Sequence, residues 1–224
     1  GTLTQALAET GAAVKAVELD DHLLPVLDKT LEHYDNVRVV HGDILRIDIE
    51  EVMNHQPFTV CANLPYYITT PINKKLLEQK LPIKRIVVMV QKEVAERMVA
   101  EPGHKIYGAL SVSVQYYTQP QMLFEISPKC FMPAPEVTSA VVAMDVRQQP
   151  PVDLIDEKRF FQVVKAAFQQ RRKTFSNALK NTCMSKEQIA QVLEKTGIDG
   201  IRRGETLSLQ EFADIANAWS EIIR

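Results

Sequence analysis

The chain has 224 residues and a net charge of −2, with a hydrophobic fraction of 46% and a charged fraction of 24%. These values are typical of a globular protein of one or two domains, and no apolar run of about 18 residues offers a membrane span. The three cysteines, which form no CxxC pair, disfavour a disulfide framework or zinc finger and favour a reducing, cytoplasmic compartment (Cys61, Cys130, Cys183). No charged leader with an apolar stretch is visible after Gly1, so we expect no signal peptide.

The first two-thirds of the chain alternate in type between helical and strand patterns. Helices are expected at Thr2–Glu9, at Asp20–His33, from Thr70 onward and at Gln91–Ala100. Strands are expected at Ala13–Val17, Val37–Val40, Phe58–Ala62, Ile86–Val90, Met122–Ile126 and Val137–Val146, while Gly108–Tyr117 fits either type. This alternation predicts an α/β fold with a largely parallel sheet.

A proline-containing stretch, Gln148–Pro151, interrupts this pattern and predicts a domain boundary. The predicted domains are 1–147, which is α/β, and 152–224, which is all helical. Two capping boxes and one helix-terminating glycine support the helical assignment (Ser185, Ser208 and Gly197).

Charge is unevenly distributed along the chain. Residues 1–150 carry a net charge of −4 and residues 151–224 a net charge of +2, and positions 158–180 hold seven basic residues and no acidic one. Such a stretch attracts phosphate groups, although a solvated helix face has the same composition. The candidate RNA-binding residues are Lys165, Arg171, Arg172 and Lys173.

Polar residues follow three consecutive predicted strands, at Glu18, Asp43 and Asn63. Ligands of open parallel sheets bind beyond the carboxyl ends of the strands. A carboxylate at Glu18 can accept from ribose hydroxyls and one at Asp43 from an adenine amino group, so the pair predicts an adenosine site. Each residue taken alone is also compatible with an ordinary turn or helix cap.

The tetrapeptide Asn63-Leu64-Pro65-Tyr66 is suited to methylation of an exocyclic amine. The lone pair of the adenine amino group is delocalised into the ring, and two acceptors that bind its hydrogens can localise it. The Asn63 side-chain oxygen and a backbone carbonyl beside Pro65 supply two acceptors, and Tyr66 supplies a ring to stack on the base. The alternative is a proline-stabilised turn with a buried tyrosine.

Other residues give weaker signals. Phe131 lies in a proline-stiffened loop where its ring can serve as a second stacking wall or as a small satellite core. Tyr116 and Tyr117 are candidates for the same base pocket or for the core. The five histidines show no metal-ligand spacing, so we expect no metal.

Three segments together resemble the bacterial small-subunit (16S) ribosomal RNA adenine N6,N6-dimethyltransferases. They are Asn63–Ile72, Phe131–Val142 and Ala167–Thr174, and the similarity extends over essentially all 224 residues. The Gln170–Lys173 run and the Arg202–Ser208 stretch narrow the resemblance from amino methyltransferases in general to this family.

The resemblance implies a Rossmann-like domain that binds S-adenosylmethionine and a small helical RNA-binding domain. Glu18 would hold the cofactor ribose, Asp43 and Ile44 the cofactor adenine, and Gly1 would match the last glycine of the cofactor loop. Asn63, Leu64, Pro65 and Tyr66 would form the catalytic motif, which also borders the cofactor, and Phe131 would stack on the target base. The implied partner is 16S rRNA within the small ribosomal subunit, with two methyl groups added to each of two adjacent adenosines, and we expect a monomer without membrane attachment.

Family members carry several dozen residues before the position of Gly1, including a first strand and most of the glycine loop. The resemblance therefore predicts that the chain as printed binds the cofactor weakly. Three alternatives stay open: a large-subunit adenine methyltransferase of the macrolide-resistance type, a non-catalytic RNA-binding assembly factor, and a dinucleotide dehydrogenase that uses Glu18 on the ribose.

Overall fold

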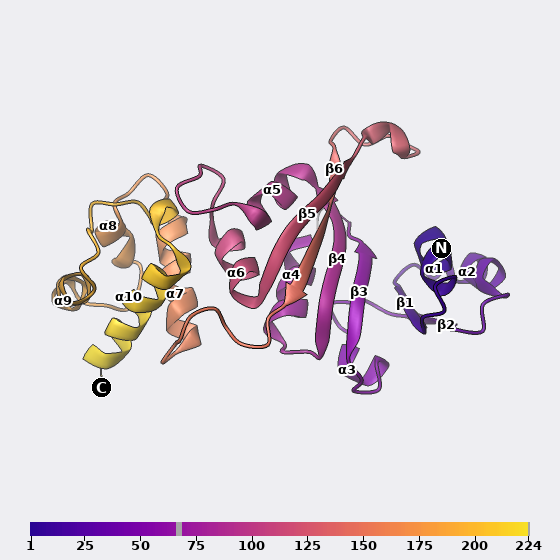
Figure 1. Cartoon of the computed structure of the whole chain (residues 1–224), viewed down its shortest axis with the longest axis horizontal. Helices are drawn as coiled ribbons and strands as arrows, with labels where there is room; N and C mark the ends of the chain where they lie inside the picture. The colour runs from indigo at the N-terminus through magenta and orange to yellow at the C-terminus, as the bar shows by residue number, and fades with distance from the viewer. Residues whose placement is uncertain (66–68, 224) are drawn as a thin grey trace. The chain divides into compact units, whose positions relative to one another are not determined.

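The computed structural model describes residues 1–65 and 69–223 (Figure 1). The chain divides into two compact units, Gly1–Val90 and Gln91–Arg224. The first unit alternates helices and strands in the predicted order. Its elements are α1 (Thr2–Ala8), β1 (Val14–Glu18), α2 (Leu24–Leu31), β2 (Val37–His41), α3 (Ile49–Val52), β3 (Phe58–Asn63), α4 (Thr69–Glu78) and β4 (Ile83–Gln91).

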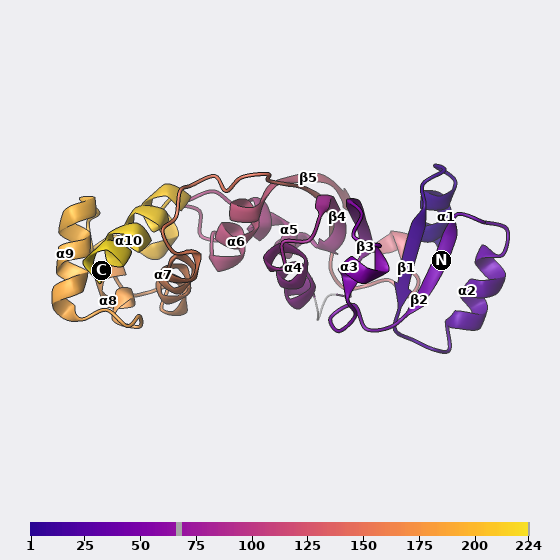
Figure 2. The ribbon, with the colours of Figure 1, turned by 90° about the horizontal axis from the view of Figure 1, so that it is seen from below.

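Parallel pairing joins the strands of the first unit, as expected for helices that connect successive strands. β1 pairs with β2 in a two-stranded sheet, from Val14 opposite Val37 to Glu18 opposite His41. Figure 2 shows these two strands side by side, with α2 next to them. β3 pairs with β4 and ends with Asn63 opposite Met89. Parallel strands end at the same edge of their sheet, so Glu18 and Asn63 each mark a carboxyl end.

Two local features of the first unit differ from the sequence-based expectation. The helix expected from Asp20 begins at Leu24, because Asp20 instead closes a turn: its Oδ1 accepts from the His22 amide and its carbonyl from the Leu23 amide. The short helix α3 was not expected. It begins after Asp48, whose Oδ1 accepts from the amides of Glu50 and Glu51.

The second unit combines an antiparallel hairpin with helices. Its elements are α5 (Lys92–Val99), α6 (Ala109–Tyr117), β5 (Thr118–Ile126), the 3-10 turn η2 (Pro128–Cys130), β6 (Ser139–Val146), α7 (Glu157–Gln169), α8 (Phe175–Leu179), α9 (Lys186–Thr196), the 3-10 turn η3 (Gly204–Thr206) and α10 (Leu209–Ile222). β5 pairs with β6 from Thr118 opposite Val146 to Ile126 opposite Ser139. The segment Gly108–Tyr117, which fits either type in the sequence, is therefore helical from Ala109.

The compact units divide at Val90–Gln91 rather than at the proline-containing stretch. The reason is the core of the second unit, which buries Tyr107, Val112 and Tyr116 together with aromatic side chains of the C-terminal helices. Apolar side chains that precede Gln148 therefore share one core with apolar side chains that follow Pro151. The division into functional domains 1–147 and 152–224 stays a prediction.

The C-terminal helices begin and end where the capping signals place them. Ser185 and Ser208 each form a complete capping box, with Gln188 and Glu211 as the reciprocal partners. Gly197 ends α9 with φ 66°, a left-handed conformation that glycine adopts without a steric penalty. Within residues 1–65 and 69–223, no helix is long and apolar enough to cross a bilayer.

Candidate functional site

Glu18 lies at the carboxyl end of β1, where its carboxylate organises the following turn. Its Oε1 accepts hydrogen bonds from the amides of Leu19 at 2.8 Å and Asp20 at 2.9 Å. Its own carbonyl accepts from the Gly42 amide at 2.8 Å. Since a carboxylate has about four lone-pair directions, this side chain retains acceptor capacity for a ribose diol. The Gly42 bond also brings the end of β1 next to the residue that precedes Asp43.

Asp43 begins a tight loop after β2. Its Oδ1 accepts from the Leu45 amide at 2.9 Å, and its Oδ2 lies 3.4 Å from the Arg46 Nε. The Asp43 side chain is 29% exposed, whereas the Arg46 side chain is 88% exposed, so the ion pair adds little to stability. Ile44 beside it is half-buried and provides an apolar surface. The structure thus places Glu18 and Asp43, the two residues predicted to bind an adenosine, at the ends of neighbouring strands.

Asn63 is exposed at the carboxyl end of β3. The next residue is anchored, because the Leu64 side chain is 8% exposed and the Leu64 amide donates to the Met89 carbonyl of β4 at 3.3 Å. Pro65 is exposed and leads toward α4. Tyr66, the fourth residue of the predicted catalytic motif, lies outside the described residues.

Cys61, in the same strand, has an ordinary structural role. Burial raises the pKa of its thiol. A thiol in such surroundings is protonated near neutral pH and is a poor nucleophile, as expected for a small core residue.

Two further predicted site residues lie elsewhere in the chain. Gly1 precedes α1, where its carbonyl accepts from the Gln5 amide at 2.9 Å, and a Cβ at this position would lie 3.1 Å from Leu27 Cδ2. Phe131, in the second unit, directly follows η2 and is half-buried. The roles of Gly1 in cofactor binding and of Phe131 in base stacking stay predictions.

The alternative role of Tyr116 in a base pocket is wrong. Its side chain is 3% exposed and packs against the Phe160 ring, with the ring centroids 5.2 Å apart. Burial and the nearby Glu157 raise the pKa of Tyr116 to about 12. Tyr117 stacks on Phe161 and its hydroxyl donates to Glu157 at 2.6 Å, so it too is part of the packing around α7.

The predicted RNA-binding residues divide into two groups. Lys165 on α7, and Arg172 and Lys173 in the turn after it, are exposed. Arg171 has a structural partner instead: its Nη2 donates to the carbonyls of Lys105, at 3.0 Å, and Tyr107. Arg171 therefore ties the turn after α7 to the segment that precedes α6.

A further exposed cation, Arg203, lies beside this turn and was not expected from the sequence. The Phe175 amide donates to the Arg202 carbonyl at 2.7 Å, and the Ser176 amide donates to the Gly200 carbonyl at 3.0 Å. These bonds bring the Arg203 segment alongside the Lys173 segment. We call Arg172, Lys173 and Arg203 the basic surface.

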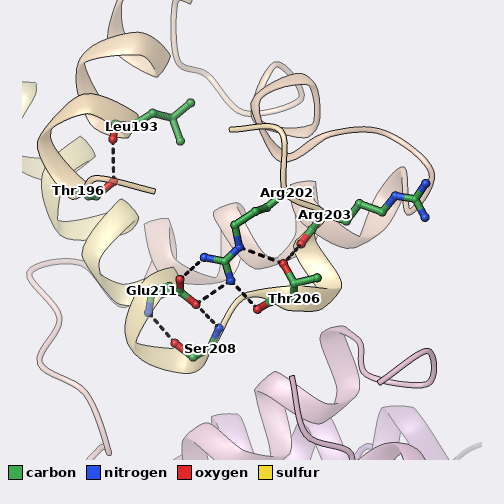
Figure 3. Close-up of polar contacts among 7 residues, drawn as sticks. All are labelled: Leu193, Thr196, Arg202, Arg203, Thr206, Ser208 and Glu211. Carbon is green, nitrogen blue, oxygen red and sulfur yellow. Dashed lines mark hydrogen bonds and ion pairs between the residues drawn. The ribbon is translucent and has the colours of Figure 1, made fainter. Parts of the chain in front are cut away.

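Arg202 and Arg203 are adjacent, but the Arg202 side chain binds other residues of the protein whereas the Arg203 side chain is exposed. Figure 3 shows the Arg202 guanidinium bound to the Glu211 carboxylate and to the carbonyl of Thr206, with Arg203 pointing away from this cluster. Burial acts to raise the pKa of Glu211, but hydrogen bonds from Arg202 and Ser208 outweigh it and hold that pKa below its ordinary value. Arg202 thus fixes the loop that presents Arg203.

The described part of the chain contains no group of three or more potential metal ligands. Its polar strand ends offer hydrogen-bond acceptors, which suit the hydroxyl and amino groups of a nucleoside.

Comparison with known proteins assigns the family. The sequence profile described as "Ribosomal RNA adenine dimethylase" matches residues 1–220. The chain belongs to this family of ribosomal RNA adenine dimethylases. Two relatives named "Ribosomal RNA small subunit methyltransferase A" are similar to this dimethylase throughout. That of Geobacillus sp. (strain WCH70) is 48% identical over all of this chain and 80% of its own length, and that of Geobacillus kaustophilus is 50% identical over 97% of this chain and 78% of its own.

Solved structures show that this dimethylase has a Rossmann-like methyltransferase fold. A dimethyladenosine transferase from Plasmodium falciparum matches with a TM-score of 0.78 at 21% identity, over 96% of this chain and 86% of its own. The 23S rRNA methyltransferase ErmE matches with a TM-score of 0.74 at 21% identity, over 98% of this chain and 87% of its own. The predicted α/β fold class is thereby confirmed.

Proposed function

We propose that this dimethylase transfers methyl groups from S-adenosylmethionine to N6 of two adjacent adenosines near the 3′ end of 16S rRNA in the small ribosomal subunit. The observation that carries the proposal is the placement of polar residues at the carboxyl ends of parallel strands: Glu18 at the end of β1, Asp43 after β2 and Asn63 at the end of β3. The names of the relatives, which refer to the small subunit, support the choice of substrate.

The residues at the ends of β1 and β2 fit an adenosine-containing cofactor. Glu18 offers carboxylate acceptors for the ribose hydroxyls, and Asp43 offers acceptors for the adenine amino group. Ile44 adds an apolar surface for the base. When bound, S-adenosylmethionine supplies an electrophilic methyl group on a sulfonium.

Asn63 and the carbonyl groups that follow it act on the target base. The Asn63 side-chain oxygen accepts from one N6 hydrogen, and a backbone carbonyl beside Pro65 accepts from the other. These bonds localise the amino lone pair and direct it at the methyl group. The bond from Leu64 to Met89 holds the backbone of this motif against β4, which favours a defined position for the acceptors.

The basic surface serves a different purpose. Arg172, Lys173 and Arg203 are exposed and lie on two adjacent segments of the second unit. Arginine and lysine side chains bind RNA phosphates without regard to sequence. We therefore assign them to docking on the ribosomal subunit rather than to base selection.

A methyl-incorporation assay tests the proposal. Small subunits and large-subunit rRNA, both unmethylated at adenine N6, are incubated with the chain and radiolabelled S-adenosylmethionine, and the products are digested to nucleosides. We expect label in the small subunit only, as N6,N6-dimethyladenosine. Label in large-subunit rRNA, or subunit binding without incorporation under cofactor saturation, would overturn it in favour of the two alternative RNA-directed functions.

A further inference from the structure

Lys75 makes a long-range contact that the methyl-transfer chemistry does not use. Its Nζ donates to the backbone carbonyl of Ile47 at 2.7 Å, across 28 residues of sequence, and the side chain is half-buried. The helix that carries it, α4, buries the side chains of Ile72, Leu76 and Leu77, which are 3–6% exposed. Lys75 therefore joins a well-anchored helix to a loop.

Residues Gly42–Asp48, which we call the Asp43 loop, are joined to one another by short-range contacts that include Ile47. The Asp43 carbonyl accepts from the amides of Arg46 at 2.8 Å and Ile47 at 2.9 Å, and the Asp43 carboxylate accepts from Leu45. Ile47 also packs on Gly42, since a Cβ at Gly42 would lie only 2.6 Å from Ile47 Cγ2. Because these bonds start and end within one turn, a displacement of the Ile47 carbonyl displaces the Asp43 carboxylate.

The other end of the contact belongs to the helix that follows the catalytic motif. The chain runs from Asn63 and Pro65 at the end of β3 into α4, and Lys75 lies on the second turn of that helix. The hydrogen bond from Lys75 to Ile47 therefore connects two parts of the proposed site. One is α4, which follows the Asn63 motif in the chain, and the other is the Asp43 loop, whose carboxylate we assign to the cofactor adenine.

We propose that Lys75 is a positioning residue that holds the Asp43 loop against α4 and so sets the affinity for the cofactor. The identity of the ligand rests on the proposed function, whereas the attachment of the Asp43 loop to α4 by Lys75 does not. A lysine suits this role because its ammonium makes a charge-assisted bond to a carbonyl while its stem packs along the helix. Without the bond, the loop loses its attachment to α4, and its internal turn opens more often.

The test compares Lys75→Met with Lys74→Met. Lys74 is the neighbouring residue on α4, 67% exposed and 3.8 Å from Glu78, so its removal controls for the loss of one positive charge on this helix. We expect Lys75→Met to weaken binding of S-adenosylmethionine by about tenfold in calorimetry and to raise its KM by a similar factor, the effect of losing one charged hydrogen bond. The KM for small subunits should not change. Lys74→Met should leave both constants as in the wild type, and Lys75→Arg should recover part of the cofactor affinity.

Hydrogen exchange tests the attachment without any ligand. The amides of Leu45, Arg46 and Ile47 should exchange faster in Lys75→Met than in the wild type or in Lys74→Met, while the melting temperatures of the two variants stay alike. Equal exchange in the two variants would overturn the inference, as would an unchanged cofactor affinity in an active Lys75→Met enzyme. A wild-type chain that shows no methyl transfer while the exchange difference is present would instead refute the proposed function alone.

Discussion

The β1–β2 pair and the helical core of the second unit are stabilised in different ways. Every residue of β1 is half-buried, although parallel strands are normally covered on both faces. The second unit instead buries large side chains completely, among them Phe160, Phe175, Phe212 and Ile215 at 0% exposure.

Polar bonds at strand ends, such as those of Glu18 and Asp43, order the first region, whereas apolar packing orders the second. Substitutions at the strand ends should therefore change activity more than stability. Substitutions among the buried side chains of the second unit should change stability more than activity. The predictions below test this contrast.

The largest effect is expected at Asn63. Asn63→Ala removes the side-chain acceptor that we assign to the reacting amine, so we expect kcat for methyl transfer to fall by about 10²–10³-fold, as for the loss of one preorganised hydrogen bond in other active sites. Single-turnover assays with small subunits measure it. The melting temperature should stay at the wild-type value, because Asn63 is exposed. A marked loss of stability with full activity would refute the contrast at this position.

The next largest effect is on stability, at Gly204. A Cβ there would lie 2.8 Å from Ala167 Cβ and 3.0 Å from the Ala167 carbonyl oxygen, so η3 could not stay against α7. We expect Gly204→Ala to lower the free energy of unfolding by about 1–3 kcal/mol. Urea denaturation followed by fluorescence of Trp219, which is 2% exposed in α10, reports on this region. Gly108→Ala is the control, because the nearest atom to its added Cβ is 3.8 Å away.

The basic surface should show smaller, salt-dependent effects. Each single change among Arg172→Ala, Lys173→Ala and Arg203→Ala should weaken subunit binding and reduce the slope of log K against log salt concentration by about 1. Arg171→Ala should lower the melting temperature as well, because its guanidinium binds the carbonyls of Lys105 and Tyr107. Filter binding across a salt series measures the slopes. An unchanged slope in all three exposed variants would remove the phosphate-binding role.

The smallest effect concerns acid stability at Glu211. Its pKa is lowered in the folded chain, so the carboxylate stabilises the fold at pH values above its ordinary pKa of 4.5, and this contribution is lost as the pH falls through the folded value. Glu211→Gln should therefore melt at a lower temperature than the wild type at pH 7, and the difference should shrink toward pH 3. A difference that does not depend on pH would show that the ion pair with Arg202 contributes nothing.

Local sequence signals predicted much of the fold. Capping boxes at Ser185 and Ser208 and the glycine at 197 mark helix ends by bonds within one turn, and these are confirmed. The residues Glu18, Asp43 and Asn63 were found because each lies at, or just beyond, the end of an apolar strand. Features determined within a few residues were therefore accessible from sequence.

Contacts between distant segments were not accessible in this way. Nothing near Arg171 in the sequence indicates that it binds carbonyls more than 60 residues away, and the same holds for Lys75 and Ile47. Arg203 joins the basic surface only because the loop before it pairs with the start of α8. The unit boundary at Val90–Gln91 likewise depends on which side chains share a core.

The central claim is that cofactor and base chemistry belong to the strand ends of the first unit and subunit docking to the basic surface. The most direct test measures subunit binding and methyl transfer in parallel for Asn63→Ala and for the combined Arg172→Ala, Lys173→Ala, Arg203→Ala variant. We predict that Asn63→Ala binds small subunits as the wild type does but transfers almost no methyl groups, and that the combined variant binds subunits weakly yet keeps wild-type affinity for S-adenosylmethionine. Loss of subunit binding in Asn63→Ala, or wild-type subunit affinity in the combined variant, would contradict it.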